Sequence, residues 1–291
     1  HPHVVDPFGH LDGAAGLAGF VVDQHRRAGG RPNDDHPRLA LQGDLELESL
    51  FDCDLVIEAR AEDPGIKAEF YRRLGSGIGS NAIVASNSSS MGPGLLAAGF
   101  AEGGGRPSRF LNLHFSSPAE NPRMQLVEIV STEDTDDDAL ATAHAFIKSI
   151  GKTPLLLHDG SAGFLVNAGL AAYFEAAEGL YREGTPVETI DRALRATVFP
   201  MGPFELGDQA GLDIAAGLLD TIAAVKRPET EPLVWKMREL GRLGVKTGAG
   251  YYDYSDGSVC GEWSGLAPLV PERGTRIAGP DEIVERCVRP L

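Results

Sequence analysis

Short apolar runs alternate with helical segments through the first 160 residues, and this alternation limits the possible folds more than any other feature of the chain. The runs are rich in Val, Ile, Leu and Phe, which is typical of strands buried on both faces of a sheet. The predicted strands are His3–Asp6, Leu39–Gln42, Leu55–Ala59, Ala82–Ser86, Phe110–Phe115, Leu126–Val130 and Pro154–His158. The pattern therefore predicts an α/β fold with a mainly parallel, doubly wound sheet.

Helix signals lie between these strands. Asp63 followed by Pro64 is a capping residue with proline at the first helical position. The spacing of the apolar residues in this helix predicts a core-facing stripe of Ile66, Phe70 and Leu74. A further helix is predicted over residues 136–150.

The pattern changes after residue 160, where the chain is predicted to be almost wholly helical. The predicted helices are Phe164–Tyr181, a segment after Thr185-Pro186, Leu212–Val225 and Leu233–Leu243. We therefore expect an α/β domain over residues 1–160 and an all-helical domain over residues 161–255. Residues 256–291 are predicted to be a linker and the start of a further helical repeat.

Composition excludes several classes of function. The net charge of −16 argues against a nucleic-acid partner. The three cysteines are far apart and form no metal-binding motif, which fits a reducing compartment and no metal site. Apolar runs long enough to span a membrane and signal-peptide patterns are absent from the sequence, so we expect no membrane partner and a cytoplasmic location.

Two of the predicted strands carry an ionisable residue that suits acid–base chemistry. His114 lies near the end of one strand, and Glu128 lies in the strand that follows. A carboxylate on the far nitrogen of an imidazole fixes the tautomer and stabilises the imidazolium, so this pair could act as an oriented general base. The alternative is a histidine that only caps its strand beside an ordinary strand glutamate.

Asn167 is a separate candidate in the helical half. At helical spacing it shares a face with Leu170, Ala171 and Phe174, which predicts that it is buried. A buried amide must find hydrogen-bond partners, either in the protein or in a ligand.

Several motifs follow one another in a fixed order along the chain. They are Leu55-Val56-Ile57-Glu58-Ala59, Ser86-Asn87-Ser88-Ser89-Ser90, the His114 strand, Leu126-Val127-Glu128, Gly151-Lys152-Thr153-Pro154, Gly163-Phe164-Leu165-Val166-Asn167, Pro200-Met201-Gly202-Pro203-Phe204-Glu205-Leu206 and Gly241-Arg242-Leu243-Gly244-Val245-Lys246-Thr247-Gly248. Over about residues 40–255 this succession resembles the L-3-hydroxyacyl-CoA dehydrogenase family, including the dehydrogenase part of multifunctional fatty-acid oxidation proteins. The resemblance implies a Rossmann-like NAD-binding domain followed by a helical dehydrogenase and dimerisation domain.

The resemblance also implies roles for the site residues. His114 would be the catalytic base, Glu128 its orienting carboxylate, and Asn167 a residue that meets both the substrate and the catalytic centre. Ser89 would contact the substrate oxygen, although a serine here could instead cap the start of a helix.

Three residues are implied to bind the NAD cofactor. Asp6 ends the strand whose acidic residue binds the adenosine ribose. Glu58 lies at the end of a later strand, and Asn87 directly follows another. Glu58 would lie near the nicotinamide. Its alternative is a solvated charge at a strand end.

The chain departs from the family pattern within the catalytic motifs. Ser116-Ser117 and Ala168 replace an asparagine and an arginine of the family, and two extra residues separate His114 from Glu128, with Pro118–Arg123 as the expected bulge. These differences weaken the resemblance of the site but leave its histidine, glutamate and asparagine in place.

The largest departure is at the start of the chain. The family's first strand and its Gly-x-Gly-x-x-Gly turn are missing, and Gly75–Gly79 is placed as an ordinary turn. We therefore expect an N-terminally truncated fragment, with an unfilled slot in the centre of the sheet and weak NADH binding by these residues alone. The segment Pro7–Pro37 also looks shorter than the helical hairpin that the family uses near the CoA moiety.

The function implied by the resemblance is oxidation of (3S)-3-hydroxyacyl-CoA to 3-oxoacyl-CoA with NAD. The expected partners are the acyl-CoA substrate and either a second copy in a homodimer or the rest of a multifunctional polypeptide. One alternative is a non-catalytic acyl-CoA-binding or dimerisation module that lacks a cofactor site. A third is a relative that acts on a hydroxy acid or a carrier-bound acyl group.

Overall fold

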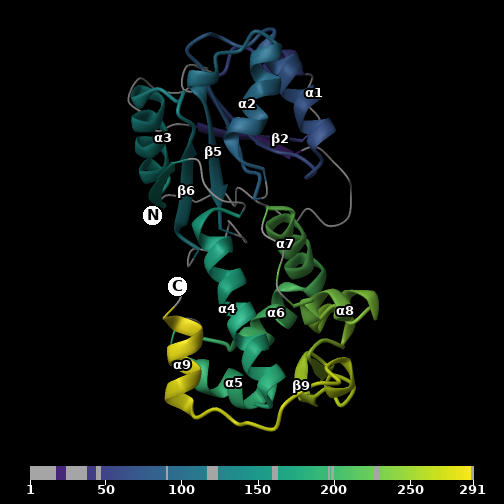
Figure 1. Ribbon diagram of the computed structural model, residues 1–291. Coiled ribbons are helices and arrows are strands. Elements are labelled where there is room, and N and C mark those ends of the chain that lie inside the picture. Colours follow the sequence, from purple (N-terminus) through teal and green to yellow (C-terminus); the bar gives the residue numbers. More distant parts are fainter. Residues whose placement is uncertain are drawn as a thin grey trace. The chain divides into compact units, whose positions relative to one another are not determined.

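A computed structural model describes residues 18–23, 38–43, 47–89, 91–116, 124–158, 163–195, 197, 200–225, 228 and 230–289. The chain divides into two compact units, residues 1–164 and 165–291 (Figure 1). The predicted strand His3–Asp6 lies outside the described residues. The domain functions assigned from the sequence stay predictions, and each unit is described by itself.

Unit 1 is built on a seven-stranded sheet with the order β2-β1-β3-β4-β5-β6-β7. Its strands are β1 Ala18–Asp23, β2 Arg38–Gly43, β3 Leu55–Ala59, β4 Ile83–Ser86, β5 Phe110–Phe115, β6 Leu126–Ser131 and β7 Thr153–His158. Parallel pairing joins β3 to β4, β4 to β5 and β6 to β7, whereas β1 pairs antiparallel with both its neighbours and β5 pairs antiparallel with β6. The Rossmann-like α/β class is confirmed.

The sheet has no unfilled slot beside β3, and in this respect the sequence-based expectation was wrong. Strand β1, which was not predicted, pairs with β3 from Val22↔Leu55 to Ala18↔Ala59 and also pairs with β2. Its run Phe20-Val21-Val22 consists of one aromatic and two β-branched residues, which are types that strands favour. Pairing on both sides satisfies backbone groups that an open edge of β3 would leave exposed.

Helices cover both faces of this sheet (Figure 1). Helices α1 (Pro64–Gly75) and α2 (Pro93–Glu102) pack on the face that carries Val84 and Phe110, and α3 (Asp137–Ser149) packs on the face of Leu111 and Leu113. Short 3-10 helices are η1 Leu47–Leu50 and η2 Pro107–Arg109. Because side chains alternate along a strand, Asn112 and His114 share the face of α1 and α2.

Helix α1 begins at its predicted cap but buries a different face from the one expected. Asp63 Oδ1 accepts the backbone N–H of Ile66 at 2.8 Å, which confirms the cap. Ile66 is 45% exposed, whereas Lys67, Tyr71 and Leu74 are completely buried. The predicted stripe was therefore wrong at its start, because polar anchors rather than hydrophobicity fix the helix orientation.

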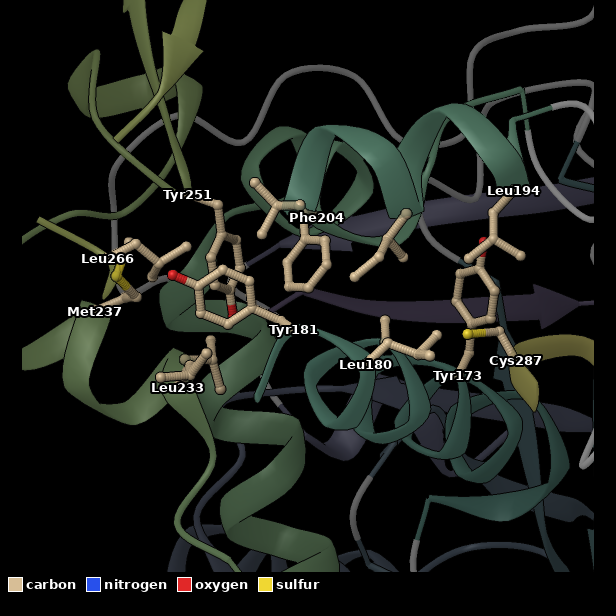
Figure 2. Packing of buried hydrophobic residues seen from close by; sticks show 14 of the residues in the cluster. Tyr173, Leu180, Tyr181, Leu194, Phe204, Leu233, Met237, Tyr251, Leu266 and Cys287 are labelled. Atoms are coloured by element: carbon tan, nitrogen blue, oxygen red, sulfur yellow. The ribbon is translucent and has the colours of Figure 1, made fainter. Parts of the chain in front are cut away.

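Unit 2 is helical, as predicted. Its helices are α4 Phe164–Glu183, which begins at the last residue of unit 1, α5 Val187–Leu194, α6 Pro203–Ala210, α7 Leu212–Val225, α8 Leu233–Glu239 and α9 Pro280–Val288. A β-hairpin of β8 (Tyr252–Ser255) and β9 (Ser258–Glu262) and the short helices η3 (Val245–Thr247) and η4 (Ala267–Leu269) complete the unit. Figure 2 shows the core, where Tyr181, Phe204 and Tyr251 meet.

The segment after residue 255 is more than the expected surface linker. It contains β9, and it contributes Leu266, Val270, Ala278, Ile283 and Cys287 to the buried core of unit 2. Helix α9 therefore completes the helical unit by packing on it. That this helix begins a further repeat stays a prediction.

Asp191 is a buried carboxylate of unit 2 that is held by neutral donors. It accepts the backbone N–H groups of Phe204 and Glu205 at 2.9 and 3.0 Å, at the start of α6, and the Tyr252 hydroxyl at 2.7 Å. Burial raises the pKa of Asp191 to about 7, although these hydrogen bonds lower it. The carboxylate thus joins α5, α6 and β8.

Asp208 plays a similar part at the end of α6. Its carboxylate accepts the N–H groups of Tyr251 and Tyr252 at 2.9 and 3.0 Å and the Tyr254 hydroxyl at 2.9 Å. A Cβ on Gly250 would lie 2.0 Å from Asp208 Oδ1, so only glycine permits this close approach. Burial raises the pKa of Asp208.

Candidate active site

His114 and Glu128 lie directly opposite each other in the antiparallel pair β5–β6. Their side chains are in contact, with His114 Nδ1 2.6 Å from Glu128 Oε2, and both residues are buried. The predicted hydrogen bond between them is confirmed. The expected bulge at Pro118–Arg123 lies outside the described residues, and the register on either side of it places the pair face to face.

This geometry defines the protonation of the imidazole. A carboxylate acceptor at Nδ1 requires that nitrogen to carry the proton, which leaves Nε2 free of its proton and able to accept one. The negative charge of Glu128 then stabilises the imidazolium that forms after proton uptake. The pair can therefore act as an oriented general base, although its catalytic role stays a prediction.

The Phe164 ring packs against His114, with ring centroids 5.4 Å apart. Phe164 is buried and has φ +54°, a left-handed conformation that is uncommon for a residue other than glycine. Such strain persists where the surrounding structure requires it, often at functional sites. The sequence analysis did not single out this residue, because neither its ring contact nor its backbone angle has a sequence signal.

The turn after β4 carries the predicted substrate and cofactor residues. Asn87 Oδ1 accepts the N–H of Phe115 at 3.0 Å, so Asn87 ties the end of β4 to the residue beside His114. Ser89 is half-buried in this turn. The structure thus brings Asn87 and Ser89 to the strand end that carries the general base, and their contacts with cofactor and substrate stay predictions.

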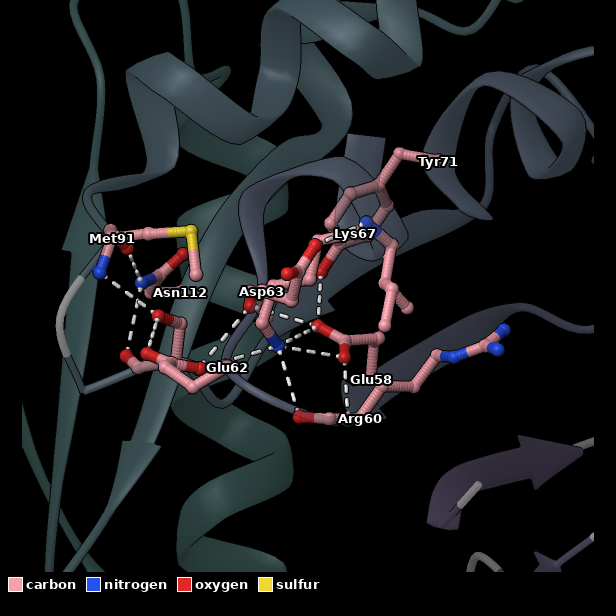
Figure 3. A network of polar contacts seen from close by, with 11 residues as sticks. Glu58, Arg60, Glu62, Asp63, Lys67, Tyr71, Met91 and Asn112 are labelled. Carbon is pink, nitrogen blue, oxygen red and sulfur yellow. Dashed lines mark hydrogen bonds and ion pairs between the residues drawn. The ribbon is translucent and has the colours of Figure 1, made fainter. Parts of the chain in front are cut away.

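Glu58 is an internal anchor rather than an exposed strand end. The residue is completely buried, which excludes the alternative of a solvated charge. Its carboxylate accepts from Lys67 Nζ at 2.8 and 2.9 Å and from the Tyr71 hydroxyl at 2.6 Å. It also accepts from Arg60 N–H at 2.5 Å and from the Ser86 hydroxyl at 3.0 Å (Figure 3). Because these internal donors already surround the Glu58 carboxylate, the structure gives no support for a direct contact with the nicotinamide. That contact stays a prediction of the resemblance.

Lys67 is the residue that sequence reasoning missed. It is completely buried, and besides Glu58 it lies 3.4 Å from the Glu62 carboxylate and donates to the Arg60 carbonyl at 3.3 Å. The helical spacing of Lys67, Tyr71 and Leu74 was a usable signal, since it defines one face of α1. A hydrophobicity pattern does not select a lysine as a core residue.

The structure does not test whether the remaining predicted residues join this group. Asp6 lies outside the described residues. Asn167 lies on α4 in unit 2, where it is half-buried together with Leu170, Ala171 and Phe174, so the expectation of a buried amide was only partly met. Its place in the catalytic centre stays a prediction.

The described residues fit the nicotinamide half of NAD better than its pyrophosphate. Polar side chains gather at the carboxyl ends of β3, β4 and β5, where doubly wound sheets bind ligands. Gly75 and Gly77 instead meet neighbouring protein atoms, since a Cβ would lie 2.4 Å from the Phe100 carbonyl and 2.1 Å from the Phe51 ring. These glycines serve packing in a turn, as the sequence predicted.

Two further classes of site are not found. Within the described ranges, no group of three His, Cys, Asp or Glu residues could hold a metal ion. Among the helices described here, none is long and apolar enough to cross a membrane.

Comparisons with known proteins place this site in a family. A model of the 3-hydroxyacyl-CoA dehydrogenase NAD binding domain matches residues 25–160, and a model of the 3-hydroxyacyl-CoA dehydrogenase C-terminal domain matches residues 163–254. The fatty acid oxidation complex subunit alpha of Shewanella halifaxensis is 35% identical over 252 residues, which cover 84% of this chain and 34% of that protein. The chain thus spans about a third of the length of the curated relatives that it matches.

Solved structures agree. FadB2 of M. tuberculosis is 36% identical with a TM-score of 0.65, over 72% of this chain and 74% of that one. The (S)-3-hydroxybutyryl-CoA dehydrogenase PaaH1 of Ralstonia eutropha is 30% identical with a TM-score of 0.62, over 73% and 75%. The resemblance inferred from the motifs is therefore confirmed, and the chain belongs to the 3-hydroxyacyl-CoA dehydrogenase family.

Proposed function

We propose that the polypeptide carrying these residues oxidises (3S)-3-hydroxyacyl-CoA to 3-oxoacyl-CoA with NAD in fatty-acid oxidation. The observation that carries the proposal is the buried contact of 2.6 Å between His114 Nδ1 and Glu128 Oε2 at the end of β5. Membership of the family supports the reaction class, and the name of the PaaH1 relative supports the S configuration and the CoA thioester.

In this reaction the substrate loses a proton and a hydride. His114 Nε2 takes the proton of the 3-hydroxyl group as the oxygen forms its double bond to carbon 3. NAD, when bound, accepts the hydride that leaves carbon 3. The Glu128 carboxylate stabilises the positive charge on the imidazole, and the Phe164 ring shields one side of it.

The other site residues are assigned by the family resemblance. Ser89 and Asn167 would contact the substrate, while Asp6, Glu58 and Asn87 would serve the NAD cofactor. The CoA substrate is the proposed partner. A homodimer, or association within a multifunctional polypeptide, is the proposed assembly, because the Shewanella relative is a subunit of a fatty acid oxidation complex. We assign the protein to the cytoplasm because its cysteines fit a reducing compartment.

Substitution of the general base tests the proposal. In the natural polypeptide that contains these residues, His114→Ala should lower kcat for reduction of acetoacetyl-CoA by NADH by about 10²–10⁴-fold. Glu128→Gln should also lower kcat, because the imidazolium loses its counter-charge. Steady-state kinetics with both variants are the measurement, with substrate KM largely retained. His144→Ala is the matched control, since His144 lies on α3, outside the site.

Near-normal turnover in the His114→Ala protein would reject the role. One observation favours the alternative of a non-catalytic acyl-CoA-binding or dimerisation module: the 291 residues contain no Gly-x-Gly-x-x-Gly turn. That alternative predicts acetoacetyl-CoA binding without turnover in the unsubstituted protein, and the same assay distinguishes the two.

A further inference from the structure

A row of polar side chains crosses three strands of unit 1 next to the general base. Glu58 pairs in register with Ser86, and Ser86 pairs in register with Asn112. All three are completely buried on the sheet face covered by α1 and α2. Asn112 is the last of the row, and it lies two residues before His114 on the same face of β5.

The amide of Asn112 is fixed by what surrounds it. Its Nδ2 donates to the Met91 carbonyl at 3.0 Å and to the Ser88 carbonyl at 3.4 Å (Figure 3). Both neighbours are acceptors, so the amide nitrogen and not the oxygen must face them. Asn112 Oδ1 consequently points elsewhere, and it is buried without a hydrogen-bond partner among the residues that the structure describes.

The unpartnered oxygen indicates that the amide nitrogen of Asn112, and not its oxygen, is the group that this position needs. A buried acceptor without a partner costs about 1–3 kcal/mol. Leucine has the same branched shape as asparagine and would fill this position without that cost. What asparagine alone supplies is the pair of bonds to the carbonyls of Ser88 and Met91, which lie on either side of Ser89 in the turn.

Other bonds close the same turn from within. The Ser88 hydroxyl accepts the Met91 N–H at 2.9 Å and donates to Glu62. The Ser88 N–H donates to the Ser86 hydroxyl at 3.2 Å, which links the turn to Glu58. Strand β5, which carries the general base, therefore holds this turn at two places. The Phe115 N–H donates to Asn87 Oδ1 at its start, and Asn112 holds the carbonyls of Ser88 and Met91 further along.

We propose that Asn112 is a positioning residue for catalysis. By binding the carbonyls of Ser88 and Met91, which lie on either side of Ser89, it fixes the position of Ser89 relative to His114. This inference rests on the proposed function, since it takes Ser89 as the contact for the substrate oxygen. Misplacement of a reacting group by about 1 Å can lower a rate 10²-fold. Asn112 thus affects turnover without touching the substrate.

The test is Asn112→Leu in the natural polypeptide, which removes both donors and keeps the branched shape. We expect kcat for acetoacetyl-CoA reduction to fall about 10–10²-fold, while KM for NADH stays within about twofold. Amide hydrogen exchange of residues 86–92 should become faster. Val84→Ala is the control, because it removes buried volume from the same face of β4 without removing a bond to the turn.

Each outcome decides the question. If Asn112→Leu has the kcat of the unsubstituted protein, the proposal is overturned, whatever the Tm of the variant. The proposal is also overturned if Asn112→Leu and Val84→Ala lower the Tm equally and Asn112→Leu loses no more kcat than Val84→Ala. If His114→Ala retains turnover, the proposed function fails instead. Hydrogen exchange of residues 86–92 then still reports whether Asn112 holds the turn, and unchanged exchange in Asn112→Leu overturns that part too.

Discussion

Two buried carboxylates, one in each unit, are compensated in different ways. In unit 1, Glu58 is paired with the ammonium group of Lys67, so both charges of an ion pair are enclosed together. In unit 2, Asp191 is enclosed by a tyrosine hydroxyl and two backbone N–H groups, and within the described residues no ion pair reaches it. The first arrangement balances charge with charge, and the second balances charge with dipoles alone.

This difference predicts that the carboxyl group without a cationic partner makes the stability of its unit depend on pH. Desolvation disfavours the charged form of a carboxyl group unless an opposite charge compensates for it. For Asp191 desolvation is the largest effect and raises the pKa to about 7, and the hydrogen bonds from Tyr252, Phe204 and Glu205 only reduce the shift. A buried ion pair, by contrast, is sensitive to the removal of one partner.

The largest expected effect comes from breaking the ion pair. Lys67→Met should lower the unfolding free energy of unit 1 by about 3–5 kcal/mol, because it leaves the Glu58 charge buried without its cation. Urea unfolding followed by far-UV circular dichroism should show this loss. Tryptophan fluorescence should not change, since Trp235 and Trp263, the two tryptophans of the chain, both lie in unit 2.

Two further variants sharpen this prediction. Lys148→Met, at an exposed position on α3, should leave both transitions unchanged. Adding Glu58→Gln to Lys67→Met should recover part of the loss, because the uncompensated charge is then gone. A loss in Lys148→Met as large as in Lys67→Met would contradict the role given to the pair.

The next effect is a pH dependence of unit 2. The folded pKa of Asp191, about 7, lies above the ordinary value of 3.8, so the folded state keeps a proton that the unfolded state releases between these values. The contribution of Asp191 to the stability of unit 2 is therefore greatest below about pH 4, and roughly 2–4 kcal/mol of it is lost as the pH rises to about 7. Urea unfolding followed by tryptophan fluorescence across this range is the measurement.

Asp191→Asn tests the origin of that decline. The amide cannot ionise, so the fall in unfolding free energy between pH 4 and 7 should become smaller in this variant by the contribution of Asp191. The raised pKa values of Glu178, Asp208 and Glu262 should keep the rest of the decline. Asp256→Asn, in an exposed turn where asparagine tolerates the φ of +51°, is the matched control and should keep the decline. An undiminished slope in Asp191→Asn would show that neutral donors compensate the carboxylate as well as a cation does.

The smallest expected effect concerns one hydroxyl group. Tyr252→Phe removes the 2.7 Å hydrogen bond to Asp191 and should cost unit 2 about 1 kcal/mol. Tyr181→Phe is the control, because the buried Tyr181 hydroxyl has no hydrogen-bond partner in the described structure and its removal should cost nothing. Equal unfolding free energies for the two variants would show that the Tyr252 hydroxyl does not stabilise the Asp191 carboxylate.

The sequence predicted the strands of unit 1 almost to the residue wherever the whole run is buried. Leu55–Ala59 and Phe110–Phe115 were predicted with the bounds that the structure shows. Strand β1 was missed because its apolar run is short and because its partner β3 is far away in the sequence, so pairing rather than propensity creates it. Four helices of unit 2 and the start of α9 were predicted from periodicity and caps, whereas α6 was not predicted.

In the candidate site, too, contacts with a local sequence signal were predictable and contacts set by tertiary pairing were not. The contact between His114 and Glu128 was predictable, since each residue sits at a recognisable position in a strand with its own motif. The row of Glu58, Ser86 and Asn112 was not, because register between strands is set by tertiary pairing and leaves no local pattern. Hydrophobic spacing likewise could not identify Lys67, whose burial depends on a partner nine residues away.

The tyrosines are all buried except Tyr254, which is half-buried, and this has a practical consequence. The chain has six tyrosines, and burial raises the pKa of each of them, to about 12 for Tyr181. In the folded protein none of these phenols ionises near pH 10, as a free tyrosine does. Tyrosinate absorbance that develops near that pH therefore comes from unfolded molecules. Five of the six chromophores lie in unit 2, so the alkaline spectrum mainly records the opening of its core.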